Sequence, residues 1–168
     1  MEERKELCDI VVEALENIGV NIEDLVVIVY DLQRKYNEDI SMEDCEENLL
    51  KVFEKREVIN TVLTGLAIDK MVQEGKFPEP IQSVIKRDDG LYGVDEILPL
   101  GIVNLYGTIG LTNFGYLDKE KPGVINEIDQ RKKDGHQVTT FTDDILAAIV
   151  AAAAARIAHG QRLQEENK

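Results

Sequence analysis

The sequence predicts an all-α domain, and three observations favour this fold class. Apolar residues recur at helical spacing through most of the chain. Asn21 and Ser41 each precede an aspartate by three positions, which is the pattern of a helix N-cap. Near the C-terminus, residues 145–155 form an uninterrupted apolar run that is mostly alanine. A helix that is apolar on every side is buried, so this run predicts a central helix.

The length of the chain predicts one domain. A chain of 168 residues is typical of a single domain, and no repeat, low-complexity linker or change in composition divides it. We therefore expect residues 1–168 to form a single helical bundle in which other helices surround the alanine-rich helix. The alternative for that helix is a surface position, which the high helix propensity of alanine would also allow.

The first half of the chain divides at caps and glycines. The first helix carries its apolar face on Leu7, Val11, Ala14, Leu15 and Ile18. It is expected to end before Gly19, and the next two helices are expected to begin after Asn21 and Ser41. The β-branched residues at 26–30 leave a short strand as an alternative within the second helix. A fourth helix is expected to end near Gly75.

The second half divides at prolines and turns. A short helix is expected after Pro80, and Asp88-Asp89-Gly90 predicts a turn. Residues 94–106 predict a buried helix. Three glycines then weaken the helical pattern as far as Pro122.

The last two helices are separated by a polar segment. Pro122 is expected to begin a helix that runs to about Arg131. Residues 132–139 predict a loop, which contains His136. Thr140, with Asp143 three positions later, predicts the N-cap of the alanine-rich helix.

The charge balance excludes several classes of function. Acidic residues outnumber basic ones 33 to 19, giving a net charge of −14. A general nucleic-acid binder and a polybasic membrane anchor both need the opposite balance. Aromatic residues make up 5% and tryptophan is absent, which argues against a base-stacking platform.

The sequence also shows no segment that would direct the chain to secretion or into a membrane. The charged start lacks an apolar leader, and the apolar run at 145–155 is shorter than the roughly 20 residues of a membrane span. Cys8 and Cys45 form no C-x-x-C pair. We expect a soluble cytoplasmic protein with no transmembrane segment, at most transient membrane contact and no nucleic-acid partner; it can form a homo-oligomer.

Carboxylates are the remaining candidates for chemistry. The sequence lacks a P-loop and a G-x-S-x-G elbow, and its two histidines cannot build a multi-histidine metal site. Three acidic positions lie in or beside apolar helical sequence, namely Asp95-Glu96, Asp118 and Asp143-Asp144. Carboxylates near a core are costly unless they are paired or bind a cation such as Mg²⁺, which prefers oxygen ligands.

Each acidic position also has a purely structural interpretation. Asp143-Asp144 can cap a helix, and Asp118 can pair with Lys121. Asp95-Glu96 are adjacent and point about 100° apart, so only one would face a shared ion unless the helix starts there. Asp88-Asp89 are interpreted as acids of the turn.

The same residues carry a resemblance to a known family. The segment from Asp88-Asp89-Gly90 to Asp95-Glu96 resembles the D-H-G-x-x-x-x-D-E motif of phosphatidylglycerophosphatase A. The segment from Leu117-Asp118 to Lys121-Pro122 resembles its L-D-x-x-K-P motif, and Asp143-Asp144-Ile145 its D-D motif. The motifs occur in the family's order. The match to the membrane enzyme covers residues 86–160, and the whole chain resembles the soluble YutG-like, or low-temperature-requirement C, branch.

Two residues depart from the motifs. Asp89 stands where the family has histidine, and Val94 stands where it has tryptophan before Asp-Glu. The hydrophobic spans of the membrane enzyme are missing.

The resemblance implies an all-helical Mg²⁺-dependent phosphomonoesterase. The family's substrate is phosphatidylglycerophosphate, so a lipid headgroup or a phosphorylated small molecule is the expected partner. The expected metal ligands are Asp95, Glu96, Asp118, Asp143 and Asp144. Lys121 would offset the phosphate charge, and Glu96 would be a ligand or orient the attacking water. Asp95, Glu96, Asp118, Lys121 and Asp143 are therefore the candidate catalytic residues.

Two other functions remain open on sequence alone. One is a metal-binding or regulatory protein of this fold with reduced catalysis. The other is an all-α nucleotide pyrophosphohydrolase, which uses an E-x-x-E…E-x-x-D array. Glu13 and Glu16 would begin such an array and Glu43 and Glu46 would follow, but no suitable E-x-x-D comes after them.

Overall fold

The computed structural model describes residues 2–135 and 137–166, with side chains described for 7–135 and 137–161. These residues form helices and no strand, so the all-α prediction is confirmed and the strand alternative at 26–30 is wrong. His136, expected in a polar loop, lies outside the described residues. In chain order the elements are α1 (Glu2–Glu16), α2 (Ile22–Gln33), α3 (Met42–Val52), α4 (Arg56–Gln73), α5 (Ile81–Arg87), α6 (Val94–Val103), the 3₁₀ helix η1 (Asn104–Tyr106), α7 (Gly107–Glu120), α8 (Val124–Lys133) and α9 (Thr142–Glu166).

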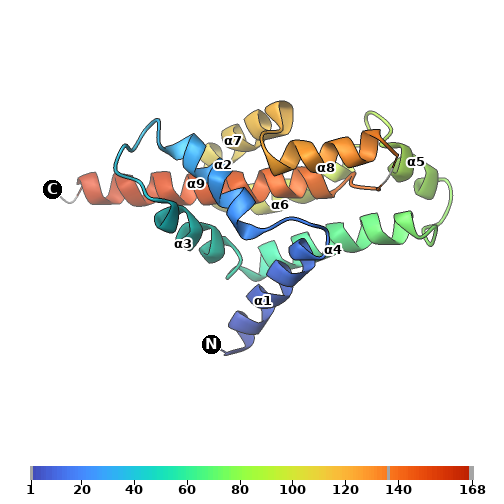
Figure 1. Cartoon of the computed structure of the whole chain (residues 1–168), viewed down its shortest axis with the longest axis horizontal. Helices are drawn as coiled ribbons and strands as arrows, with labels where there is room; N and C mark the ends of the chain where they lie inside the picture. Colours follow the sequence, from blue (N-terminus) through green and yellow to red (C-terminus); the bar gives the residue numbers. More distant parts are fainter. Residues whose placement is uncertain (1, 136, 167–168) are drawn as a thin grey trace.

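Helix α9 is the central element of the bundle. It runs along the long axis of the molecule and is contacted by α2, α3, α4, α6, α7 and α8 (Figure 1). Residues 145–155 have no exposed surface at all. The small alanine side chains let the surrounding helices approach closely on every side, which confirms the predicted central helix and excludes the surface alternative.

The predicted starts of α2 and α3 are confirmed in detail. The Ser41 hydroxyl accepts a hydrogen bond from the Asp44 N–H at 3.0 Å, and the Asp44 carboxylate accepts one from the Ser41 N–H at 3.0 Å. The Asn21 N–H donates to the Asp24 carboxylate in the same way, at 3.2 Å. These capping boxes satisfy N–H groups that the first helical turn leaves without partners.

Helix α7 is an element that the sequence analysis did not predict. Its three glycines weaken the helical pattern, but at Gly110 the missing side chain is required by packing. A Cβ atom there would lie 2.9 Å from the carbonyl oxygen of Val103 and 3.2 Å from the Cβ of Tyr106. Gly110 therefore allows α7 to lie close to the end of α6.

The expectation that residues 94–106 form a buried helix is only partly right. Pro99, Ile102, Val103 and Tyr106 are buried, but Ile97 is 65% exposed. By length and composition, residues 94–120 could cross a membrane, with a mean hydropathy of 1.3 over 18 residues. The chain breaks its helical path there at Gly107, whose φ of 69° and ψ of −158° are not helical.

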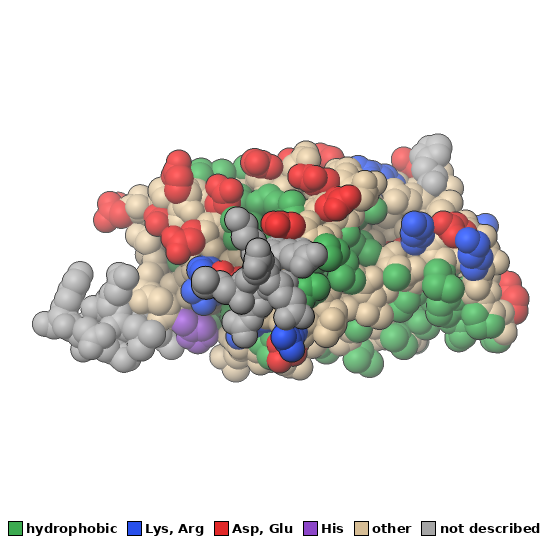
Figure 2. All heavy atoms as spheres, turned by 90° about the horizontal axis from the view of Figure 1, so that it is seen from below, with side chains coloured by type: hydrophobic (Ala, Val, Ile, Leu, Met, Phe, Trp, Pro, Cys, Tyr) green, Lys and Arg blue, Asp and Glu red, His purple; other side chains and the backbone are tan. Residues whose placement is uncertain are grey.

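The surface carries many acidic side chains, as the composition requires. Figure 2 shows one face of the molecule, with acidic side chains gathered over its left part and hydrophobic side chains exposed over its right part. The acid-rich helix α3 contributes Glu43, Asp44, Glu46 and Glu47, all of them exposed. Their exposure keeps these four charges in water.

Helices α8 and α9 begin later than the sequence analysis predicted. Helix α8 begins at Val124, and it continues past the expected end at Arg131 to Lys133, which makes Lys132 helical. Helix α9 begins at Thr142, and Thr140 does not cap it, because the Thr140 hydroxyl donates to the carbonyl oxygen of Ile85 at 2.8 Å. The cap comes from another helix, as described below.

Candidate functional site

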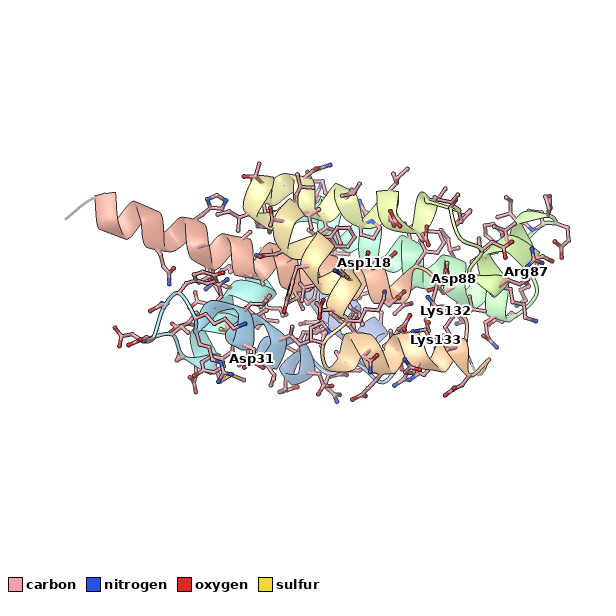
Figure 3. The ribbon with its side chains drawn as sticks, turned by 90° about the horizontal axis from the view of Figure 1, so that it is seen from above. Asp31, Arg87, Asp88, Asp118, Lys132 and Lys133 are labelled. Atoms are coloured by element: carbon pink, nitrogen blue, oxygen red, sulfur yellow. The ribbon has the colours of Figure 1, made fainter. Side chains whose placement is uncertain are left out.

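A cavity of about 220 Å³ collects polar side chains from the ends of several helices. Its lining includes every residue that the sequence analysis proposed for the site: Asp95, Glu96, Asp118, Lys121, Asp143 and Asp144. Figure 3 shows Asp88, Asp118 and Lys132 around the N-terminal end of α9. The three motif segments, which are far apart in sequence, therefore meet at one place.

Helix ends place these side chains in the cavity. Asp95 and Glu96 lie in the first turn of α6, and both line the cavity because the helix begins just before them, at Val94. Asp118 lies in the last turn of α7 and Lys121 follows it as the C-cap, with a left-handed φ of 44°. Asp143 and Asp144 occupy the first turn of α9, where the positive end of the helix dipole favours carboxylates.

Lys121 lies among three of these carboxylates. Its Nζ is 2.7 Å from Asp143 Oδ2, 3.2 Å from Asp118 Oδ1 and 3.7 Å from Asp144 Oδ1. Burial lowers the pKa of Lys121, but the negative charges of Asp143, Asp144 and Asp118 raise it by more, so the net shift is upward. Lys121 is therefore held in its charged form.

Sequence reasoning missed a second lysine in the cavity. Lys132 Nζ lies 2.7 Å from Asp88 Oδ2 and 3.5 Å from both Asp129 Oδ1 and Asp143 Oδ2. Asp88 and Asp129 line the cavity as well, and neither was among the predicted site residues. The signal was the helical period of α8, since 125, 128, 129 and 132 share one face, but the predicted helix ended before Lys132.

Asp143 joins the two lysines. Its Oδ2 is the oxygen shared by Lys121 and Lys132, while its Oδ1 is buried without a hydrogen-bond partner. The pKa of Asp143 is raised by burial, although the charges of Lys132 and Lys121 act against that shift. Asp95 Oδ1 is also buried without a partner, and burial likewise raises the pKa of Asp95. The cavity thus holds two carboxylate oxygens that lack a partner.

Asp144 is the carboxyl group that resists ionisation most clearly. Its side chain is 8% exposed, and burial together with the negative charges of Asp143 and Asp118 raises its pKa to about 9. A hydrogen bond with Asp118 also favours the protonated form. The cavity therefore holds more carboxyl groups than its two lysines can neutralise.

Asp69 of α4 fixes the start of α9 from outside the cavity. Its carboxylate accepts hydrogen bonds from the backbone N–H groups of Phe141 and Thr142 and from the Thr142 hydroxyl. It thereby supplies the cap that Thr140 was expected to provide. The burial of Asp69 could have been predicted from the sequence, because it lies on the buried face of α4 with Val62, Gly65 and Val72.

The donor set suits a hard cation, since it consists of carboxylate oxygens and two of these oxygens lack partners. Within the described residues, however, no three acidic, histidine or cysteine side chains surround one point closely enough to hold an ion. The lysine ammonium groups occupy the spaces between the carboxylates instead. A cation would therefore be bound together with a movement of these side chains.

The acids of the alternative pyrophosphohydrolase array do not form a site. Glu13 and Glu16 lie on α1, Glu43 and Glu46 lie on α3, and all four are exposed. None of them lines the cavity.

Comparison with known proteins agrees with the motifs. The family model for phosphatidylglycerophosphatase A matches residues 16–159. YpjQ of Bacillus subtilis is 54% identical over 164 residues, which is 97% of this chain and 91% of that protein. YutG of the same organism is 45% identical over 147 residues, covering 88% and 87% of the two chains.

A solved structure shares the whole architecture. The low temperature requirement C protein of Listeria monocytogenes superposes with a TM-score of 0.88 and 47% sequence identity, covering 93% of this chain and 97% of that one. The family match spans all three motif segments that meet in the cavity. The chain therefore belongs to the phosphatidylglycerophosphatase A family.

Proposed function

We propose that the cavity at the start of α9 hydrolyses a phosphomonoester with Mg²⁺ as its cofactor. The observation that carries this proposal is the meeting of Asp95, Asp118, Asp143 and Asp144 in one cavity with two lysines. Family membership supports a phosphatase-like activity. Phosphatidylglycerophosphate is the family's substrate, and a soluble phosphomonoester with the same terminal group is the alternative.

The residues that would hold the cation are Asp95, Glu96, Asp118, Asp143 and Asp144. Asp95 and Asp143 each offer a buried oxygen without a hydrogen-bond partner, which leaves lone pairs available to a cation. When bound, Mg²⁺ neutralises charge that develops on the phosphoryl oxygens and lowers the pKa of water.

The protein's own groups have separate tasks in this proposal. Lys121, charged and 22% exposed, offsets the negative charge of the phosphate. Glu96 is exposed at the cavity and accepts a proton from the attacking water. The oxygen of that water bonds to phosphorus while the bond from phosphorus to the ester oxygen breaks. Orthophosphate is released, and the ester oxygen takes the proton held by Glu96 and leaves as an alcohol. Neither serine nor cysteine lines the cavity in the described residues. Direct attack by water is the proposed route, and attack by an aspartate to form an acyl phosphate is the alternative.

A phosphate-release screen tests the proposed function. Lipid and soluble phosphomonoesters, including phosphatidylglycerophosphate, are incubated with the protein in Mg²⁺ and in its absence. We expect Mg²⁺-dependent release from at least one of them. Mg²⁺ binding without turnover on any substrate would instead support a metal-binding or regulatory protein of the same fold.

A further inference from the structure

We propose that Lys132 is a second phosphate-binding residue of the cavity, acting beside Lys121. This inference rests on the proposed function, because it assigns a role in the same site. Lys132 lies in no motif that carries the family resemblance, and the fold places it in the cavity.

The charge of the cavity requires more than one cation. Eight carboxyl side chains line it, and Lys121 and Lys132 are the two cationic side chains among its described lining residues. An incoming phosphate meets strong repulsion unless ammonium groups face it. Lysine binds phosphate as a compact point charge, so the position of each ammonium decides where the phosphate rests.

Lys132 is placed to face such a phosphate. Its ammonium approaches the same oxygen of Asp143 that Lys121 approaches, at 3.5 Å and 2.7 Å respectively. The two ammonium groups therefore flank one point in the cavity wall. A single phosphate has enough oxygens to accept hydrogen bonds from both.

A phosphate can replace a present partner of Lys132 at a small cost in free energy. Its side chain is 13% exposed, so the ammonium has already lost most of its water. Its nearest partner is Asp88, whose side chain is 32% exposed and can return to solvent. A phosphate oxygen that replaces the Asp88 carboxylate gives the buried ammonium another anionic partner, so no buried charge is left unpaired.

The neighbouring residue provides a matched control. Lys133 follows Lys132 on α8, pairs with Asp129 and is 58% exposed, and it does not line the cavity. The two lysines share a helix, a charge and an acidic partner, and they differ in the direction in which they point. Figure 3 labels both on α8.

Calorimetric titration with inorganic phosphate tests the proposal, in saturating Mg²⁺ and in its absence. We expect Lys132→Gln to weaken phosphate binding about tenfold or more, which is the loss of one charge-assisted hydrogen bond. Lys133→Gln should change it by less than about twofold, because Lys133 does not line the cavity and its partner Asp129 keeps Lys132 as a second partner. Lys132→Arg, which keeps the charge, should fall between the two.

Three results would contradict the role of Lys132 in phosphate binding. If Lys132→Gln binds phosphate within about twofold of the parent, Lys132 is only a structural counter-ion of Asp88 and Asp143. The loss of one charge-assisted hydrogen bond would weaken binding by more than twofold. Parent protein that binds no phosphate would also overturn the proposal. If Lys132→Gln does not fold by circular dichroism, Lys132→Met, which keeps the apolar stem and removes the charge, carries the test, and phosphate binding within about twofold of the parent's overturns the assignment.

Activity separates this inference from the proposed function. Turnover with an unchanged KM in Lys132→Gln would overturn the role of Lys132 and leave the phosphatase proposal standing. Phosphate binding that depends on Lys132, without turnover on any substrate, would support this inference and contradict the phosphatase.

Discussion

Asp69 and Thr142 share two hydrogen bonds, from the Thr142 N–H at 2.9 Å and from the Thr142 hydroxyl at 2.7 Å. Thr142 immediately precedes Asp143, the carboxylate that contacts both lysines of the cavity. The cap therefore sets the position of the first turn of α9 and, with it, the two aspartates that face the cavity. A residue of α4 that lies outside the cavity thus holds part of the candidate site in place.

The Asp69 cap predicts a pH dependence of stability. Burial raises the pKa of Asp69 to about 7, although its hydrogen bonds with Thr142 and Phe141 favour the charged form. Above about pH 4 the unfolded chain releases this proton, while the folded protein keeps it until about pH 7. The folded state then binds more protons than the unfolded state, so the contribution of Asp69 to stability falls as pH rises through this window.

Comparison with Asp69→Asn isolates that contribution, because asparagine does not titrate. The free energy of unfolding of the parent minus that of the variant should fall between about pH 4 and about pH 7 and level off above it. Urea unfolding at a series of pH values measures this difference. A difference that stays constant across the window would show that Asp69 is ionised throughout.

Two glycines of α7 should respond in opposite directions to alanine. Gly115 has open space around its missing Cβ, so Gly115→Ala should raise the free energy of unfolding by about 0.5–1 kcal/mol. Gly110 has a carbonyl oxygen 2.9 Å from that position, so Gly110→Ala should lower it by about 1–3 kcal/mol. Urea unfolding of both variants checks this, and changes of the same sign would contradict the packing of α7 on α6.

The central helix should not tolerate larger side chains. Ala152 and Ala153 have no exposed surface, so Ala152→Leu or Ala153→Leu should destabilise the fold by about 1–3 kcal/mol through overpacking. Ala67→Leu on α4 is the control, since Ala67 is exposed. Thermal melts of Ala152→Leu and Ala153→Leu that match the parent would mean that α9 is not closely packed.

Mg²⁺ should stabilise the fold through the cavity. A cation that binds only the folded state adds about 2.7 kcal/mol at a hundredfold excess over its Kd. Mg²⁺ should therefore raise Tm by more than a monovalent salt of equal ionic strength. Asp143→Asn should remove that difference, because it removes a proposed ligand while keeping the shape of the side chain. Equal melts in the two salts, or an unchanged response in Asp143→Asn, would make Asp143 a structural residue only.

The central helix and the candidate site residues in its first turn could be predicted from the sequence alone. The apolar run at 145–155 has one physical explanation in a chain of this size, which is burial on all sides. The proposed site residues followed from the resemblance of three segments to the motifs of a known family. The expectation that Asp95, Asp118 and Asp143 are metal ligands came from those motifs rather than from periodicity.

The remaining features depend on tertiary contacts that no local pattern specifies. The low helix propensity of Gly110 argues against a helix when the local sequence is considered alone. In the fold, its missing side chain allows α7 to pack against Val103. Lys132 was assigned to a loop because the polar run from Arg131 hides where α8 ends. Asp69 caps α9 across a separation of more than seventy residues, so neither helix alone predicts the contact.

Phosphate release by the parent and by Asp143→Asn, measured on one phosphomonoester in Mg²⁺, tests the central claim most directly. Asp134→Asn is the matched control, because Asp134 is an exposed aspartate at the end of α8 that does not line the cavity. The account predicts that the parent and Asp134→Asn release phosphate at similar rates and that Asp143→Asn, still folded by circular dichroism, loses at least about 99% of the rate, as expected for a group that stabilises the transition state. Equal rates in all three proteins would contradict the assignment of the reaction to this cavity.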